Sequence, residues 1–335
     1  MNKEIDFVLT YLNPNDVEWQ AEKNKFIPGE MADVNPNRYR EWNNLQYFFR
    51  GVEKYAPWVR KVHVVTCGHV PEWLNTNHPK VNIVKHKDYI PAEWLPTFSS
   101  RCIDMNFHRI PELAEHFVYF NDDMFITNPV EPEDFFKDGK PCDTAILVPN
   151  QLKVSGSIAL HLAPVVDTAV INSHFDLKKT VRQKRSNWIS TKYGRSVIRS
   201  MFLMSYPKFC GFKPNHLPYS YLKSTYQTVW NEEAQLCTLA SSHRFREVID
   251  VNHWIFTYWQ YATNQFYPRK VNDGYCFQLR NVKDAEKAKK SILAKRYKLV
   301  CLNDTLEDNS SFETISNCVN MALKTILDQK SMFEQ

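Results

Sequence analysis

The strongest constraint on the fold of this chain is a series of short apolar runs that end in polar turn residues. The first run stops at the sequence NPND, residues 13–16, and the last stops at NDD, residues 121–123. The runs are rich in β-branched and aromatic residues, which is typical of buried strands. We therefore predict four strands, with ligands bound near their carboxyl ends. These strands lie at residues 5–12, 61–66, 80–85 and 115–120.

Helical patterns separate these runs and indicate the fold class. Between residues 39 and 55, Leu45, Phe48, Phe49 and Val52 recur at the spacing of one helix face. Two further strands are expected at residues 143–148 and 297–302, and we expect the later one to return to the sheet. Strands that alternate with helices predict an α/β fold, a Rossmann-like, mostly parallel sheet flanked by helices.

The second half of the chain has a different character. The pattern becomes helical and basic from about residue 167 to residue 263. We therefore expect a mostly helical insertion in the second half, at residues 165–265, which completes the active site. Residues 1–164 and 266–335 would then form an α/β catalytic core.

Charge and cysteine content set limits on partners and location. The net charge of +5 suits anionic substrates but equally suits no special partner, and no nucleic-acid motif is present. The eight cysteines are dispersed without a CxxC pair, which indicates free thiols in a reducing compartment. The sequence has neither a signal-peptide pattern nor a membrane-length apolar run. A cytoplasmic protein is expected, and the basic residues at 178–185 leave peripheral contact with the inner face of the membrane open.

Adjacent carboxylates follow the strand at residues 115–120. Asp122 and Asp123 would repel each other unless a cation lies beside them. Mg²⁺ or Mn²⁺ is the natural partner of such oxygen ligands, and a solvated turn is the alternative. Asn303 and Asp304 follow the late strand in the same way, so the two strand ends could share one metal.

Three further positions could carry chemistry. His216 lies between Pro214 and Pro218, and a histidine fixed in this way can remove a proton from a hydroxyl. Arg246 could bind phosphate oxygens through its guanidinium group. Ser99 and Ser100 precede a helix, where they could cap it or present backbone N–H groups to a phosphate. The alternative for each is an ordinary surface role.

Several common catalytic motifs are absent from the sequence. It has no GxxxxGK[ST] loop, no GxGxxG fingerprint and no GxSxG elbow. An ATP-loop enzyme, a dinucleotide-dependent enzyme and a serine hydrolase therefore lack support.

Taken together, the segments resemble the Stealth family, bacterial capsule and exopolysaccharide phosphotransferases related to the catalytic subunit of N-acetylglucosamine-1-phosphotransferase. The resemblance runs from about residue 5 to residue 304 in four blocks. The most specific block contains RYR at 38–40, YAPWVRK at 55–61, VTCG at 65–68, PEWL at 71–74, LPTFSS at 95–100, HRIP at 108–111 and YFNDD at 119–123. The family usually has aspartate where this chain has Asn13, and such departures bear on the sugar preference more than on the reaction type.

The resemblance implies transfer of a sugar-1-phosphate from a UDP-sugar to a hydroxyl of a polysaccharide or lipid-linked glycan, with release of UMP. The implied catalytic residues are His216, Arg246 and Asp123. The implied donor-binding residues are Arg38, Arg40, Thr10, Ser99 and Ser100, and the implied Mg²⁺ or Mn²⁺ ligands are Asp122, Asp123, Asn303 and Asp304. The alternatives are a metal-dependent glycosyltransferase that releases UDP and a non-catalytic carbohydrate-binding protein.

Overall fold

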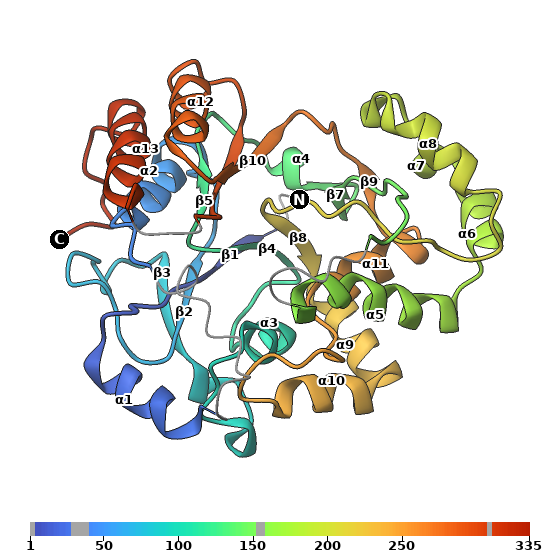
Figure 1. The fold of residues 1–335 in the computed structure, drawn as a ribbon, viewed down its shortest axis with the longest axis horizontal. Helices are drawn as coiled ribbons and strands as arrows, with labels where there is room; N and C mark the ends of the chain where they lie inside the picture. The colour runs from blue at the N-terminus through green and yellow to red at the C-terminus, as the bar shows by residue number, and fades with distance from the viewer. Residues whose placement is uncertain (1–3, 28–39, 152–157, 307–309) are drawn as a thin grey trace.

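The computed structural model describes residues 4–27, 40–151, 158–306 and 310–335. Its central five-stranded sheet has the order β3-β2-β1-β4-β8 (Figure 1). Strands β1 to β4 run parallel to their neighbours, and β8 runs antiparallel to β4 at the edge. The strands are β1 (Ile5–Thr10), β2 (Val62–Thr66), β3 (Val81–Lys85), β4 (His116–Phe120) and β8 (Tyr219–Leu222). The four strands predicted in the first 120 residues are thus confirmed.

The central strands are almost entirely buried, and they include one charged residue. Asp6 in β1 is fully buried and accepts hydrogen bonds from Arg60 Nε at 2.8 Å and from the Ala114 backbone N–H at 2.8 Å. His63 Nε2 in β2 lies 3.0 Å from the same carboxylate. Burial alone would raise the pKa of Asp6, but hydrogen bonds from His63 and Arg60 lower it below its usual value. This cluster fixes β1 against β2.

The late strand lies in a second sheet, so its predicted return to the main sheet is wrong. Strand β11 (Leu299–Asp304) runs parallel to β10 (Gly274–Leu279) and antiparallel to β5 (Met124–Ile126). The free edge of β4 is already paired with β8, and β5 offers β11 an edge directly after residues 121–123. This pairing places the ends of β4 and β11 side by side.

The strand predicted at residues 143–148 is also largely wrong. Strand β7 (Lys140–Asp143) ends where that strand was expected to begin. It forms a small sheet with β6 (Phe136–Lys137) and β9 (Tyr267–Pro268). Beyond it, Leu147 makes only an isolated bridge with Phe212. The apolar run therefore packs as buried irregular chain, which periodicity cannot distinguish from a short strand.

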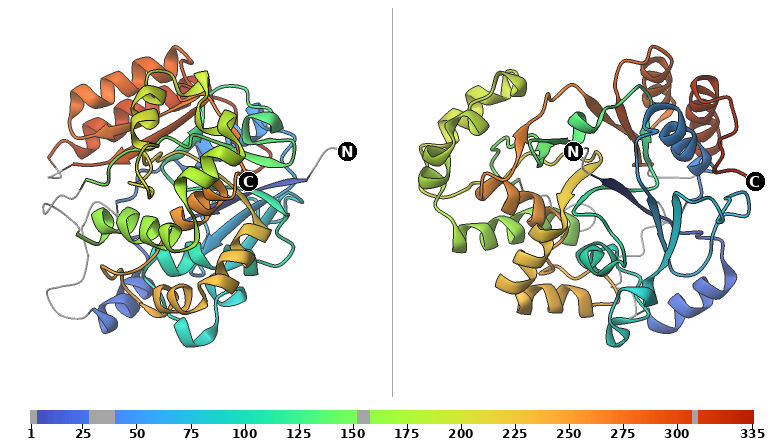
Figure 2. Two further views of the ribbon diagram at one scale, coloured as in Figure 1. Left: turned by 90° about the vertical axis from the view of Figure 1, so that its right-hand side faces the viewer. Right: turned by 180° about the vertical axis from the view of Figure 1, so that it is seen from behind.

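Helices cover the sheets on several sides (Figures 1 and 2). Helix α2 contacts β5, α12 packs on α13 and β10, and α11 packs on α5, α9 and β8. The helices of the first half are α1 (Val17–Phe26), α2 (Leu45–Tyr55), α3 (Ser100–Met105) and α4 (Pro132–Phe135). Those of the second half are α5 (Ile158–His174), α6 (Leu177–Gln183), α7 (Arg185–Trp188), α8 (Ser196–Leu203), α9 (Lys223–Glu232), α10 (Ala234–Ser242), α11 (Trp254–Ala262), α12 (Val282–Leu293) and α13 (Phe312–Ile326). Short 3₁₀ helices are η3 (His86–Asp88), η4 (Ala92–Trp94), η5 (Phe107–Arg109) and η6 (Thr191–Tyr193).

The fold is mixed α/β with a mostly parallel main sheet. The residues between 165 and 265 are mainly helical, but they also supply β8 to that sheet. The predicted domain boundaries stay a prediction. Within the described ranges, no helix is both long and apolar enough to cross a membrane.

Candidate active site

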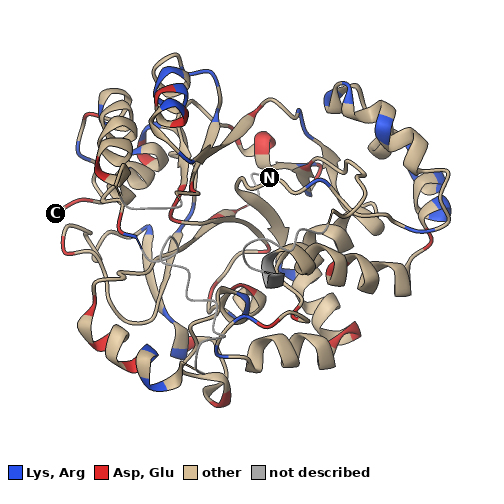
Figure 3. Ribbon diagram, in the orientation of Figure 1, with Lys and Arg blue, Asp and Glu red and all other residues tan. Residues whose placement is uncertain are grey.

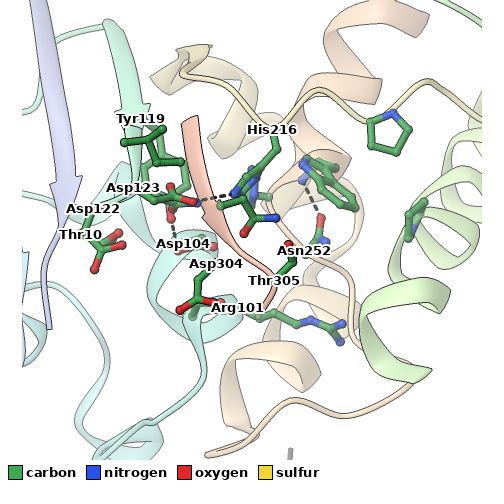
Figure 4. A pocket seen from close by; sticks show the side chains of 18 of the residues that line it. Thr10, Arg101, Asp104, Tyr119, Asp122, Asp123, His216, Asn252, Asp304 and Thr305 are labelled. Atoms are coloured by element: carbon green, nitrogen blue, oxygen red, sulfur yellow. Dashed lines mark hydrogen bonds and ion pairs between the residues drawn. The ribbon is translucent and has the colours of Figure 1, made fainter. Parts of the chain in front are cut away.

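A large open cleft lies where the ends of several elements meet. Its volume is about 1400 Å³. The carboxyl ends of β1, β4 and β11, together with α3, the loop before β8 and the segment before α11, line part of it (Figure 4). The segment before α2, residues 148–151, α5 and α8 also contribute. Thr10, Asp122, Asp123, Asn303 and Asp304 line it.

Asp123 and His216 form the central pair of the cleft. His216 Nε2 lies 3.4 Å from Asp123 Oδ2, and the two side chains are 32% and 23% exposed. Figure 4 shows the imidazole directed at the carboxylate. Burial would lower the pKa of His216, but the charge and hydrogen bond of Asp123 raise it above its usual value. Burial would raise the pKa of Asp123, and the charge and hydrogen bond of His216 hold it below the usual range.

Asp123 has a second partner and one unsatisfied oxygen. The Cys301 thiol donates to Asp123 Oδ2 at 3.1 Å. Asp123 Oδ1 is buried and has no hydrogen-bond partner. Such an orphaned acceptor costs stability unless a cation or solvent satisfies it. Asp123, His216 and Cys301 also place one ligand atom each within 4.8 Å of one another, a mixed set that suits a softer metal than Mg²⁺.

Asp122 presents an exposed carboxylate to the cleft. Desolvation of the carboxylate within the cleft is the main cause that raises the pKa of Asp122 to about 7. The nearby carboxylates of Asp123 and Glu41 raise it further. Repulsion of this kind is relieved when a divalent cation binds between the carboxylates. Asp122 and Asp123 together therefore fit an oxygen-ligated divalent cation.

Asp304 and Asn303 are engaged with neighbouring side chains. The Arg40 guanidinium donates to both carboxylate oxygens of Asp304, at 2.9 and 3.0 Å. The Asn303 side-chain amide donates to Gln278 Oε1 at 2.8 Å. Arg40 thus enters the cleft bound to one of the predicted metal ligands.

The other predicted donor-binding residues are placed differently from one another. Arg246 lines the cleft and donates to Ser100 Oγ at 2.6 Å. Thr10 and Ser100 also line it, whereas Ser99 is fully buried and does not. Arg38 lies outside the described residues.

Sequence reasoning missed several residues in the cleft. Asp104 in α3 accepts a hydrogen bond from the Tyr119 hydroxyl at 3.1 Å, and burial raises its pKa to about 7 despite the charge of Arg246. Burial and the positive charges of His216 and Arg246 lower the pKa of His253 to about 3. The polar pair Asn252-His253 before an apolar helix was the signal that could have found this region.

The cleft carries both signs of charge, and some opposite charges lie side by side, as in the Arg40–Asp304 pair. Its acidic residues are Glu41, Asp104, Asp122, Asp123 and Asp304, and its basic residues are Arg40, Arg101, Arg199, Lys213 and Arg246. A cation held by Asp122 and Asp123, together with arginines elsewhere in the cleft, would suit a diphosphate.

Comparison with known proteins gives the family. Residues 38–143 match the model of Stealth protein CR2, conserved region 2. The chain is 38% identical to the capsular polysaccharide phosphotransferase WcwK of Streptococcus pneumoniae, over 99% of this chain and 98% of that protein. It is 33% identical to the exopolysaccharide phosphotransferase cps2G of Lactiplantibacillus plantarum, over 99% and 96%. Among solved structures, mouse xyloside xylosyltransferase 1 is similar with a TM-score of 0.38 and 13% identity, over 91% of this chain and 99% of that one. The chain belongs to the Stealth family of capsular and exopolysaccharide phosphotransferases.

Proposed function

We propose that the protein transfers a sugar-1-phosphate from a UDP-sugar to a hydroxyl group of a polysaccharide or lipid-linked glycan in capsule or exopolysaccharide synthesis. The observation that carries the proposal is the meeting of Asp122, the Asp123–His216 pair and Arg246 in one cleft. The full-length similarity to polysaccharide phosphotransferases supports the reaction class.

The proposed reaction is a displacement at the sugar-side phosphorus of the donor. The acceptor oxygen forms a bond to this phosphorus, the bond from the phosphorus to the bridging oxygen breaks, and UMP leaves with that oxygen. The acceptor proton passes to His216. Since Nε2 of His216 faces Asp123, Nδ1 is the nitrogen we assign as the base. Asp123 then orients the imidazole and stabilises its charged form, as carboxylates do beside catalytic histidines.

Positively charged groups are needed beside the donor diphosphate, because phosphoryl transfer depends on positioning and charge stabilisation. We assign Arg246 and Arg40 to the phosphate oxygens, with Ser100 holding the Arg246 guanidinium. Thr10 ends β1 and lines the cleft, and it stays a candidate for donor binding. Arg38 and Ser99 are kept as weaker candidates, since the first is not described and the second does not reach the cleft.

We assign a divalent metal ion to the cleft beside Asp122 and Asp123. Asp122 and Asp123 would hold Mg²⁺ or Mn²⁺, and the orphaned Oδ1 of Asp123 is the atom that most needs such a partner. Asn303 and Asp304, at the adjacent strand end, stay weaker ligand candidates, since Gln278 and Arg40 already bind their side chains. When bound, the ion would neutralise charge on the donor diphosphate.

The test is the identity of the nucleotide released from UDP-sugars in the presence of Mg²⁺ and a glycan acceptor. UMP, with a phosphodiester signal in the product, is the expected result. Release of UDP would mean that the anomeric carbon is attacked and that the enzyme is an ordinary glycosyltransferase. Carbohydrate binding without nucleotide release, across donors and acceptors, would favour a binding protein.

A further inference from the structure

Helix α8 presents large apolar side chains to solvent. Ile198, Met201 and Phe202 are 58%, 49% and 72% exposed. They lie three and four residues apart and therefore share one face of the helix. Tyr206, one turn beyond Phe202, is 56% exposed. We refer to these four residues as the α8 crest, an exposed apolar cluster of the kind that marks an interaction surface.

The crest lies within an acid-free stretch of the chain. No aspartate or glutamate occurs between Asp176 and Glu232, whereas eleven basic residues do. They are Lys178, Lys179, Arg182, Lys184, Arg185, Lys192, Arg195, Arg199, Lys208, Lys213 and Lys223. The whole chain has 42 Lys and Arg against 37 Asp and Glu, so the rest has 31 basic against 37 acidic residues. Eight of the eleven lie between residues 178 and 199, along α6 to α8 (Figure 3).

The crest is fixed to the body of the protein next to the cleft. Ser200, on the opposite side of α8, is fully buried and its hydroxyl accepts a hydrogen bond from the Leu147 N–H at 3.0 Å. Arg199 of the same helix and Lys213 line the cleft. Helix α8 lies at the edge of the molecule (Figures 1 and 2), and it contributes Arg199 to the cleft while the crest residues are exposed to solvent.

We propose that the α8 crest and the basic residues around it form a docking surface for an anionic phospholipid bilayer. An amphipathic helix with aromatic and aliphatic side chains on one face and Lys or Arg beside them binds at the headgroup boundary. The charge complementarity favours a negatively charged membrane because a row of cations without acidic neighbours is attracted to anionic lipids. If the acceptor is lipid-linked, a step that rests on the proposed function, docking would bring the cleft to it.

The experiment is flotation of the full chain with phosphatidylcholine vesicles that contain or lack phosphatidylglycerol. The protein is expected to float with the anionic vesicles only and to dissociate as salt is raised. The variant Ile198→Ser/Met201→Ser/Phe202→Ser should partition at least about tenfold more weakly. The matched control Val17→Ser/Met321→Ser/Met332→Ser, at residues 77%, 62% and 67% exposed elsewhere, should bind like the parent protein.

A charge variant provides an independent second test. Lys178→Gln/Lys179→Gln/Arg182→Gln leaves the crest intact and should weaken anionic-vesicle binding several-fold. Unchanged melting temperatures would show that all variants are folded. The proposal is overturned if the parent protein does not float, if the crest and control variants bind equally, or if the crest variant instead converts a dimer to a monomer in light scattering. Vesicle binding needs neither donor nor acceptor, so its failure would leave the transfer reaction untouched.

Discussion

At the scale of single residues, His216 is the side chain on which the proposed chemistry depends most. We expect His216→Ala to lower kcat by about 10² to 10⁴, because the acceptor proton would lose its base. The dissociation constant of the UDP-sugar should change little, since the proposed donor contacts are the arginines and the metal. The measurement is single-turnover kinetics together with calorimetric donor binding.

The matched control for His216 is His174→Ala. His174 also pairs with a carboxylate, Glu233, at 2.6 Å, but it lies outside the cleft. Its loss should leave both constants unchanged. Weakened donor binding with normal turnover in His216→Ala would instead make His216 a donor-binding residue.

Asp104 predicts a pH dependence of stability. Its pKa rises from 3.8 to about 7 on folding because burial disfavours its charged form. Between these values the folded protein holds a proton that the unfolded chain has released, so the free energy of unfolding falls as pH rises. Asp104→Asn cannot ionise and should lose this slope, with a gain on the order of 2 kcal/mol at pH 8 relative to pH 5.

Urea unfolding at both pH values measures the effect. Asparagine can still accept the Tyr119 hydroxyl, so the contact that orients the side chain is kept. Asp138→Asn, in an exposed turn, is the control and should show equal effects at both pH values. A parallel pH profile for Asp104→Asn and the parent would show that Asp104 is ionised throughout this range.

The sequence could place only those cleft residues whose position depends on their immediate neighbours in the chain. Asp122 and Asp123 directly follow a recognisable strand, so their position at the sheet edge could be predicted. His253 and Asp104 reach the same cleft from buried helix ends, and their role depends on contacts between distant segments. The Arg40–Asp304 pair joins residues 264 positions apart, which no local pattern reveals.

At the scale of elements, the packing of α2 on β5 is a further determinant of site geometry. A Cβ atom at Gly51 would lie 2.7 Å from the Ile126 carbonyl oxygen, which is backbone and cannot rotate away. Gly51→Ala gains about 1 kcal/mol in helix propensity but must displace β5, so we expect a net loss of about 1–2 kcal/mol. Because β5 follows Asp123 directly, activity should fall as well.

Thermal unfolding and a transfer assay check this prediction. Gln46→Ala, on the same helix and only partly buried, is the control and should change stability by less than about 0.5 kcal/mol. Stability equal to or above that of the parent for Gly51→Ala would show that α2 can move away from β5 without cost.

The elements that the sequence predicted well are those that carry their own signal. Buried apolar runs and a helical stripe mark β1 to β4 and the core of α2. The partner of a strand is not encoded in its periodicity, so β11 was assigned to the wrong sheet. Residues 143–148 look apolar enough for a strand but are buried as irregular chain.

At the scale of the whole molecule, the charged residues of the cleft come from distant parts of the chain. Asp122, Asp123 and Asp304 come from strand ends of the two sheets, whereas Arg199, Lys213 and Arg246 come from helices and loops of the second half. The proposed binding of a cation and an anionic donor requires that these parts are held together. Ligand binding should therefore stabilise the folded chain as a unit.

This argument predicts a cooperative thermal shift with Mg²⁺ and UDP. Each ligand alone should raise the melting temperature modestly, because the charge that the other ligand supplies is then missing from the cleft. One ligand at about 100 times its dissociation constant adds about 2.7 kcal/mol of stability, and the two together should add more than the sum of their separate effects. Asp122→Asn and Asp123→Asn should each remove most of the Mg²⁺ contribution. Asp328→Asn, at an exposed site that does not line the cleft, should keep it. The readout is a melting curve and needs no acceptor.

An equal shift with UDP in the presence of a chelator would mean that the arginines alone bind the nucleotide. Asp122 and Asp123 would then need a role other than holding a metal.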